Sequence, residues 1–199
     1  GLQYGSEDAI TFSTEVHKLL AIEVYRASVD LAEERGSFGI FDAEREKNNP
    51  FIKRIKKHAP KVYEKMLKVG RRNIAMLTIA PTGSISICTQ TTSGIEPVFM
   101  VSYKRRRKVN PNDKNVVVSF VDEVGDSWEE YNVFHPKFIT WLKVNGYDAD
   151  EVKGKKDDEL NAIIEKSPYF NATSNDINWV SKEKMQGDIQ KWVDHSISV

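Results

Sequence analysis

A short apolar run near the middle of the chain constrains the fold more than any other feature. Ala75 to Ala80 reads Ala-Met-Leu-Thr-Ile-Ala, and Pro81 ends it. A run of this length between turn signals is typical of a strand buried on both faces, although periodicity alone leaves a helix open.

A long helix is predicted from about Glu7 to Arg35. The Ser6 hydroxyl can cap its first turn, and Gly36 can end it. Apolar residues recur at steps of three and four, which is the spacing of one helical face: Phe12, Val16, Leu19, Leu20, Val24, Ala27 and Leu31. We therefore expect this face to point into the core.

Prolines and glycines predict several shorter helices. Pro50 and Pro60 suit first helical positions, and Gly70 and Gly146 suit helix ends. The expected helices cover residues 50–57, 60–69, 136–144 and 157–166, and a last helix begins at Ser181.

Two β-rich segments predict an antiparallel hairpin that leaves the main body of the fold. Residues 98–103 and 116–121 flank Asn110-Pro111-Asn112-Asp113, a strong turn signal. A further strand is expected to begin over residues 197–199.

The balance of charge argues against large anionic partners. Lys and Arg number 29, and Asp and Glu also number 29, so no global field attracts nucleic acid or an anionic membrane. The densest basic run, Lys104–Lys108, is interpreted as a solvated strand end. No stretch approaches about 18 apolar residues, so no membrane span is expected.

The first residues lack the features of a signal peptide, which favours a cytoplasmic location. The chain also starts with Gly1 instead of Met, and we expect it to be an excised segment of a longer protein. The single cysteine, Cys88, excludes an internal disulfide and is interpreted as a small buried hydrophobe. The four histidines are scattered, so no metal site is expected, and the four tryptophans are interpreted as core.

One stretch groups hydrogen-bond donors that suit an anion. The expected strand leads into Pro81-Thr82-Gly83-Ser84, and the residues that follow could open a helix. Backbone N–H groups at a helix start would then lie near the hydroxyls of Thr82, Ser84 and Ser86. Gly83 would let the backbone approach a phosphate without a Cβ. An ordinary strand-to-helix turn with capping hydroxyls explains the same pattern, so both interpretations stay open at this point.

The same stretch resembles the large subunit of ribonucleotide reductases. The resemblance is carried by Asn73–Ser86 and, at near-fixed spacing, by Ser93-Gly94-Ile95-Glu96-Pro97. It extends weakly to Ala27–Ala32 and to Gln190–Ser198. The segments 121–126 and 134–136 are most similar to the adenosylcobalamin-dependent branch, class II, which carries an insertion here.

The resemblance implies a fold, a function and a site. The chain would contribute part of the family's ten-stranded α/β barrel, with a β-hairpin insertion at about residues 104–135. The intact enzyme would reduce ribonucleotides to 2′-deoxyribonucleotides by radical chemistry, with adenosylcobalamin as the radical source. The residues implied to bind the substrate's phosphates are Pro81, Thr82, Gly83, Ser84, Ile85 and Ser86.

The resemblance also implies partners and limits. The partners would be a ribonucleoside diphosphate or triphosphate and the remainder of the reductase chain. A cut barrel exposes unpaired strand edges, so we also expect a tendency to form homodimers. The family's radical-bearing cysteine lies in an Asn-x-Cys-x-Glu pattern, which Cys88 does not match. We therefore carry over no catalytic residue and expect this chain alone to be inactive.

Two alternatives stay open. The chain could belong to a class I large subunit, which takes its radical from a separate metal-bearing partner. It could also be a non-catalytic interaction module in which Lys104–Lys108 binds an acidic partner.

Overall fold

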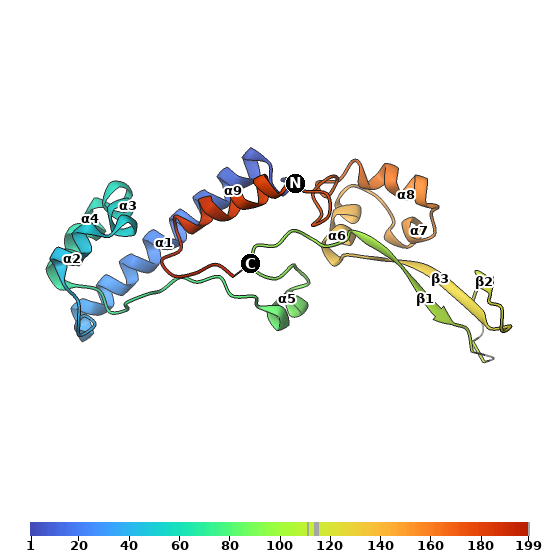
Figure 1. Cartoon of the computed structure of the whole chain (residues 1–199), viewed down its shortest axis with the longest axis horizontal. Helices are drawn as coiled ribbons and strands as arrows, with labels where there is room; N and C mark the ends of the chain where they lie inside the picture. Colours follow the sequence, from blue (N-terminus) through green and yellow to red (C-terminus); the bar gives the residue numbers. More distant parts are fainter. Residues whose placement is uncertain (111, 114–115, 199) are drawn as a thin grey trace. The chain divides into compact units, whose positions relative to one another are not determined.

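The chain forms two compact units, each with its own hydrophobic core (Figure 1). The structure is a computed structural model that describes residues 1–110, 112–113 and 116–198. The helical unit comprises residues 2–82 and 177–198, and the sheet unit comprises residues 83–176.

The helical unit is built on one long helix, α1, which spans Glu7–Arg35 as predicted. Ser6 caps it, because its hydroxyl accepts a hydrogen bond from the Ala9 amide at 3.1 Å. Gly36 ends it with a φ of 77°, a conformation that glycine adopts without strain.

Shorter helices accompany α1: α4 and α9 pack against it, α3 packs against α4, and α2 packs against α3 (Figure 1). They are α2 (Ala43–Asn48), α3 (Pro50–His58), α4 (Pro60–Val69) and α9 (Trp179–Gln190). The two helices predicted from prolines begin at those prolines. The last helix begins two residues before the predicted Ser181, because the Asn178 side chain caps it. The short helix α2 was not predicted; Asp42 caps it.

The core of the helical unit lies where α1 meets α3 and α4. Its members are almost fully withdrawn from solvent: Ala21, Tyr25, Val29, Phe51, Ile52, Ile55, Val62, Tyr63, Met66 and Trp192. Burial of such side chains stabilises a fold by about 1.5–3 kcal/mol each.

The predicted core face of α1 is wrong for this chain. Phe12 is 60% exposed and Leu19 is 62% exposed, whereas Tyr25 and Val29 are buried. The helix carries apolar residues on more than one face, and the face that includes Tyr25 is the one that contacts α4. Periodicity finds an apolar stripe but does not say which of two stripes a neighbouring helix covers.

The run Ala75–Ala80 is extended but is not a strand buried on both faces. Ile79 forms a parallel bridge with Ile197, which confirms that a strand begins near the end of the chain. Among the described residues this is the run's only strand partner, and Met76, Leu77 and Ile79 are half-buried. The prediction of full burial therefore fails, since apolar content alone does not supply the neighbouring strands.

The sheet unit carries a three-stranded antiparallel sheet in the order β1-β3-β2. The strands are β1 (Ser102–Lys108), β2 (Phe120–Val121) and β3 (Ser127–Phe134). Antiparallel pairing in this part of the chain is confirmed, but the predicted partners are wrong. β1 pairs with β3, and the expected partner, residues 116–121, contributes only the short β2.

Charge explains the missed strand. Glu129 and Glu130 lower the β-propensity of β3, yet they lie directly opposite Arg107 and Arg106. The Asp113 amide donates to the Asn110 carbonyl at 2.9 Å, as the turn predicted over residues 110–113 requires. Pro111 and Val199, which belong to the predicted turn and the predicted terminal strand, lie outside the described residues.

Three helices follow the sheet and enclose the second core. They are α6 (Pro136–Val144), α7 (Ala149–Lys153) and α8 (Asp157–Ile164). Phe138 and Leu142 of α6 are fully buried, and the Phe134 ring meets Phe138 edge-on at 5.4 Å. The short α7 was not predicted.

The architecture is a mixture of helices and sheet, with no closed barrel in the part of the chain that the structure describes. Within the same residues, none of the helices is both long enough and apolar enough to cross a membrane.

Candidate functional site

Buried side chains hold the segment that leads into the predicted site, residues Asn73–Ala80, which we call the approach segment. The Ser28 hydroxyl of α1 donates to the Asn73 side-chain oxygen at 3.0 Å and accepts from the Asn73 amide at 3.0 Å. The Arg71 guanidinium donates to the carbonyls of Asn73 and Ile74, each at 3.1 Å. The start of the segment is therefore fixed by side chains instead of by a strand ladder.

Arg71 is itself buried and paired. Its Nη1 lies 2.7 Å from Glu46 Oε2, and both side chains are largely withdrawn from water. The guanidinium also lies over the rings of Tyr25 (5.4 Å) and Phe38 (5.2 Å). Glu46 Oε2 accepts no well-directed hydrogen bond, so its contact with Arg71 is an ion pair without a hydrogen bond. A buried charge in this arrangement depends on its partner.

Asp194 holds the middle of the approach segment. Its carboxylate accepts hydrogen bonds from the Leu77 amide at 2.8 Å and the Met76 amide at 3.1 Å. It also accepts one from the Tyr25 hydroxyl at 2.9 Å. Burial raises the pKa of Tyr25, so this hydroxyl keeps its proton and donates.

Backbone hydrogen bonds then align the approach segment with residues 195–198. The His195 amide donates to the Leu77 carbonyl at 3.1 Å. The Ile79 amide donates to the Ser196 carbonyl at 3.0 Å, and the Ser198 amide donates to the Ile79 carbonyl at 2.8 Å. The two segments thus run parallel up to Ala80, and Pro81 follows directly.

The predicted phosphate-binding residues, Pro81–Ser86, which we call the candidate phosphate loop, are mostly exposed. Thr82 has a φ of 50°, in the left-handed region that a β-branched residue rarely adopts. The short helix α5 (Gly83–Thr89) begins directly after it, as the sequence suggested. Only Ser86 of the loop is buried; its hydroxyl donates to the Gly83 carbonyl at 2.7 Å and lies 3.1 Å from the Ser93 hydroxyl.

Ser84 is the member of this loop whose hydrogen-bond donors the fold does not use, and Gly83 precedes it. Neither the amide nor the hydroxyl of Ser84 has a hydrogen-bond partner among the described residues. A Cβ at Gly83 would meet no atom within 4 Å, and Gly83 does not have a positive φ. Packing and backbone conformation therefore do not require a glycine there. The donors of Ser84 are open to a ligand.

A cavity of about 490 Å³ with a mainly apolar lining adjoins α5 in the sheet unit. Hydroxyls from Ser86, Thr91, Ser93 and Ser174 line it, together with His135. Burial lowers the pKa of His135, with Lys137 adding to the effect, so neutrality is favoured.

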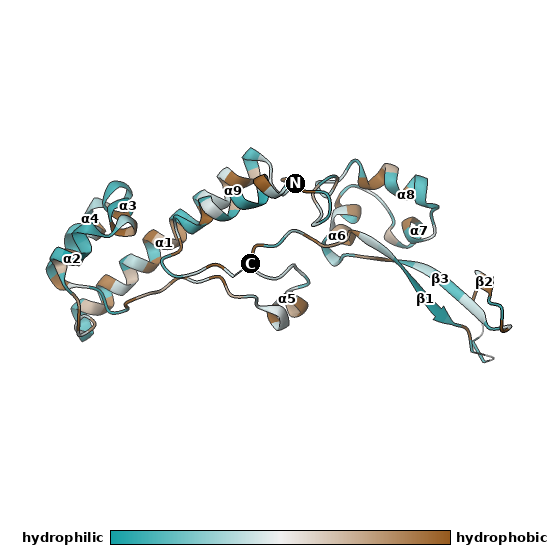
Figure 2. Cartoon of the chain, in the orientation of Figure 1, coloured by the Kyte–Doolittle hydropathy of each residue, from teal (hydrophilic) through white to brown (hydrophobic). Residues whose placement is uncertain are grey.

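The basic run Lys104–Lys108 forms most of β1, the strongly hydrophilic strand in Figure 2. Ion pairs with carboxylates neutralise much of it: Lys104–Asp157, Arg106–Glu130, Arg107–Glu129 and Lys108–Asp126. The run is therefore a poor docking surface for an acidic partner.

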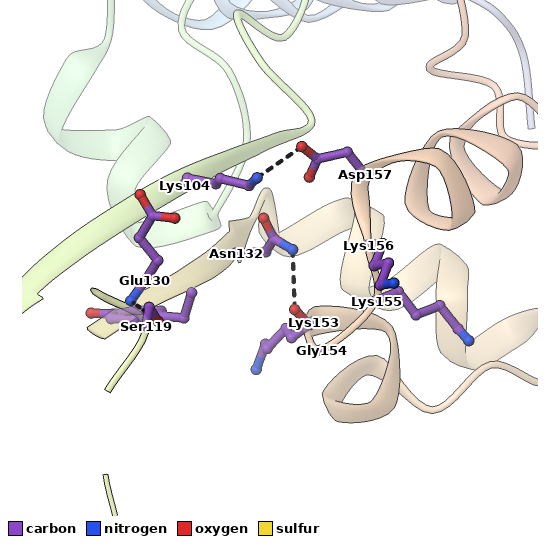
Figure 3. A pocket seen from close by; sticks show the side chains of 10 residues that line it. Lys104, Ser119, Glu130, Asn132, Lys153, Gly154, Lys155, Lys156 and Asp157 are labelled. Carbon is purple, nitrogen blue, oxygen red and sulfur yellow. Dashed lines mark hydrogen bonds and ion pairs between the residues drawn. The ribbon is translucent and has the colours of Figure 1, made fainter. Parts of the chain in front are cut away.

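A pocket of about 560 Å³ lies beside this run, between the sheet and the α7–α8 connection (Figure 3). Its floor includes the buried Asn132, whose amide group donates to the Lys153 carbonyl at 3.0 Å. The Lys104 ammonium lies 2.8 Å from Asp157 at its rim (Figure 3). Lys153 pairs with Asp150 at 2.7 Å. Two of the lysines that line the pocket are thus paired with carboxylates.

Two predictions about single residue types need correction. Cys88 is exposed on the short helix α5 instead of buried. Trp192 is in the core as predicted, but Trp179 is 74% exposed at the start of α9. Within the described ranges, no cluster of three or more His, Cys, Asp or Glu side chains could hold a metal ion.

Sequence reasoning missed the roles of Asp194, Arg71 and Ser28. The partners of Asp194 and Ser28 lie far along the chain: Asp194 and Leu77 are 117 positions apart, and Ser28 and Asn73 are 45 positions apart. No local pattern signals such contacts. Arg71 donates to residues close in sequence, but its ion-pair partner Glu46 comes from the distant α2.

Comparison with known proteins agrees with the resemblance seen in the sequence. The family model of the ribonucleotide reductase barrel domain matches residues 1–199. The chain is 33% identical to the vitamin B12-dependent ribonucleoside-diphosphate reductase of Mycobacterium tuberculosis (strain CDC 1551 / Oshkosh) over 106 residues. These residues are 53% of this chain and 12% of that protein.

Two further relatives show the same range. A vitamin B12-dependent ribonucleoside-diphosphate reductase of Thermoplasma acidophilum is 32% identical over 105 residues, which are 52% of this chain and 11% of that protein. The ribonucleoside-diphosphate reductase subunit alpha of Treponema pallidum is 22% identical over 111 residues, 54% of this chain and 13% of that protein. The matched part of the chain thus spans only a small fraction of each relative.

Proposed function

This chain belongs to the family of ribonucleotide reductase barrel domains, and on that premise we propose that it supplies the substrate-phosphate-binding loop of an adenosylcobalamin-dependent ribonucleoside-diphosphate reductase. The phosphates would be held by Pro81, Thr82, Gly83, Ser84, Ile85 and Ser86. The proposal includes a place in the family's ten-stranded α/β barrel, an insertion at about residues 104–135 and a cytoplasmic location.

One observation carries the proposal: Ser84 presents an amide and a hydroxyl that no other described residue uses. Both groups donate hydrogen bonds, and phosphate oxygens accept them. Ser84 lies in the first turn of α5, where the amide has no acceptor within the helix. Gly83 beside it leaves room for an oxygen to approach the backbone.

The apolar surface of the chain also supports a place within a larger enzyme. Phe12, Leu19 and Ile87 are more than half exposed, which is unfavourable for a surface in contact with water. Exposed apolar side chains of this kind are what one part of a barrel presents to the rest of it.

The chain's own contribution would be to bind and orient the substrate. Fixing the diphosphate places the ribose at a constant distance from the reacting groups and reduces the entropy lost in the reaction. The 2′-hydroxyl would be replaced by hydrogen elsewhere in the intact enzyme. Cys88 lacks the sequence pattern of the radical-bearing cysteine, so we propose that this chain alone has no activity.

Adenosylcobalamin would supply the radical when bound to the complete enzyme. The names of the Mycobacterium and Thermoplasma relatives support this choice of cofactor. The described residues contain no cluster of His, Cys, Asp and Glu side chains that we could assign to it.

A class I large subunit remains the second candidate, because the Treponema relative is named as a subunit alpha. Its identity of 22% is below the 33% and 32% of the vitamin B12-dependent relatives, which favours class II. Activity of the complete enzyme that requires adenosylcobalamin, and no second subunit, would support class II; a requirement for a second subunit would support class I.

Substitution of Gly83 in the complete reductase tests the phosphate assignment. Gly83→Val places a branched side chain where the anion would lie, and we expect the Kd for a ribonucleoside diphosphate to rise about 10-fold to 100-fold, equivalent to losing about 1.5–3 kcal/mol of hydrogen bonding to a charged group. Gly187→Val is the matched control, because Gly187 also has no atom within 4 Å of an added Cβ and lies away from the loop on α9. An unchanged Kd in Gly83→Val would contradict the assignment.

A further inference from the structure

We propose that Asp194 is a positioning residue for the candidate phosphate loop, acting through the backbone of the approach segment. The proposal rests on the proposed function, because the phosphate-binding role of the loop is itself a proposal. Asp194 does not touch the loop. Its carboxylate fixes Met76 and Leu77, and only Thr78–Ala80 separate them from Pro81.

Both oxygens of the Asp194 carboxylate are engaged with the approach segment. Oδ1 accepts from the Leu77 amide at 2.8 Å, and Oδ2 accepts from the Met76 amide at 3.1 Å. Hydrogen bonds to an ionised acceptor are stronger than those between neutral groups. Two consecutive amides held by one carboxylate leave little freedom for either peptide plane.

Residues 194 and 195 hold Leu77 from both of its backbone groups. The Leu77 amide donates to the Asp194 side chain, and the Leu77 carbonyl accepts from the His195 amide at 3.1 Å. Such an arrangement specifies the register of the two parallel segments. A slip by one residue would turn every side chain of the approach segment to the opposite face and would move the start of the loop by the length of one residue.

Tyr25 supports the carboxylate from the core of the helical unit. Its side chain is 1% exposed, and its hydroxyl donates to Asp194 Oδ2 at 2.9 Å. Removing this hydroxyl leaves the two amide contacts in place. Tyr25 thus stabilises Asp194, whereas Asp194 alone fixes the approach segment.

This difference allows a positioning role to be separated from a purely structural one. Asp194→Ala removes the acceptor of both amides, and we expect the Kd of the complete reductase for a ribonucleoside diphosphate to rise about 10-fold, because misplacement of binding groups by about 1 Å is costly. We expect kcat at saturating substrate to change less than twofold. Tyr25→Phe should lower the melting temperature but leave the Kd unchanged.

A double-mutant cycle with Ser84→Ala provides the decisive readout, with inorganic pyrophosphate as a second probe of the phosphate contacts. If Asp194 acts through the loop, Ser84→Ala should cost less in the Asp194→Ala background than in the wild type, for both ligands. Should Asp194→Ala fail to fold, Asp194→Asn replaces it; it keeps the shape, loses one acceptor oxygen and should raise the Kd about threefold.

The outcomes separate the two proposals. If Ser84→Ala weakens both ligands while the Asp194 variants bind them normally, or if the two substitutions are additive, the positioning role is wrong and the phosphate loop stands. If Ser84→Ala and Gly83→Val leave both ligands unaffected, the phosphate loop itself is wrong. Equal loss of affinity in Tyr25→Phe and Asp194→Ala would overturn the positioning role in favour of general destabilisation.

Discussion

The approach segment and the candidate phosphate loop are consecutive in sequence but differ in what holds them. Ser28, Arg71 and Asp194 satisfy the backbone of the approach segment with buried or half-buried side chains. The loop that follows is exposed from Pro81 to Ile85, and Ser84 leaves its donors open. A rigid support followed by uncommitted donors is the arrangement that ligand binding requires, since a donor already bonded within the protein is unavailable to a phosphate.

The largest expected effect is on the stability of the approach segment. Arg71→Ala would leave the buried Glu46 carboxylate without its cation and free the carbonyls of Asn73 and Ile74. We expect the free energy of opening at the Met76 and Leu77 amides, measured by hydrogen exchange, to fall by about 3–5 kcal/mol.

Lys65→Ala is the control for this variant. Lys65 of α4 forms ion pairs with Asp30 and Glu33 of α1 on the protein surface, at 2.8 and 2.7 Å. These pairs should contribute less than about 1 kcal/mol to stability. Equal effects of the two substitutions would show that the approach segment does not depend on the buried pair.

A smaller effect is expected at Tyr25. Tyr25→Phe removes one hydrogen bond to an ionised carboxylate and should lower the free energy of unfolding by about 1.5–3 kcal/mol, measured by chemical denaturation. Tyr63→Phe is the matched control, since Tyr63 is also buried but no hydrogen bond of its hydroxyl is found within the described chain.

The stability associated with the hydrogen bond from Tyr25 to Asp194 also depends on pH. Burial raises the pKa of Tyr25 above its usual value of 10.0, so above that pH the unfolded chain loses a proton that the folded chain retains. The stability associated with Tyr25 is therefore complete below pH 10 and falls as the pH rises further. Tyr25→Phe should flatten this decline, and an unchanged alkaline profile would show that Tyr25 is not the group responsible.

The two serines of the loop should respond in opposite ways. Ser86→Ala removes a buried hydroxyl bonded to the Gly83 carbonyl and should cost about 0.5–1.5 kcal/mol of stability. Ser84→Ala should change stability by less than about 0.5 kcal/mol, but it should weaken diphosphate binding. Denaturation and binding assays on both variants test this contrast, which disappears if Ser84 affects stability as strongly as Ser86.

The smallest effect is expected in the sheet unit, where Arg106 is 65% exposed and pairs with Glu130 at 2.6 Å. Arg106→Gln should cost no more than about 1 kcal/mol, and the loss should shrink as salt is added. A larger loss that persists at high salt would indicate that the basic strand has a role beyond its cross-strand pairs.

The sequence was a good guide where local signals decide the structure. Ser6 and Gly36 set the bounds of α1, and Pro50 and Pro60 mark the starts of two helices. These features act within one or two turns of helix, so they can be read without tertiary structure. The six residues of the candidate loop stay a prediction, made from hydroxyls, a glycine and the family resemblance together.

Features that depend on distant contacts could not be predicted. The strand β3 was missed because its glutamates are unfavourable alone and become favourable opposite the arginines of β1. The wrong face of α1 was chosen because two apolar stripes compete, and only α3 and α4 decide between them. Asp194 gave no local signal, since its amide partners are more than 100 positions away.

A structure of the complete reductase with a bound ribonucleoside diphosphate would test the central claim most directly. We expect phosphate oxygens within about 3 Å of the Ser84 hydroxyl and of backbone amides at the start of α5. Phosphates held by other residues, with Ser84 facing solvent as it does in the free chain, would contradict the claim.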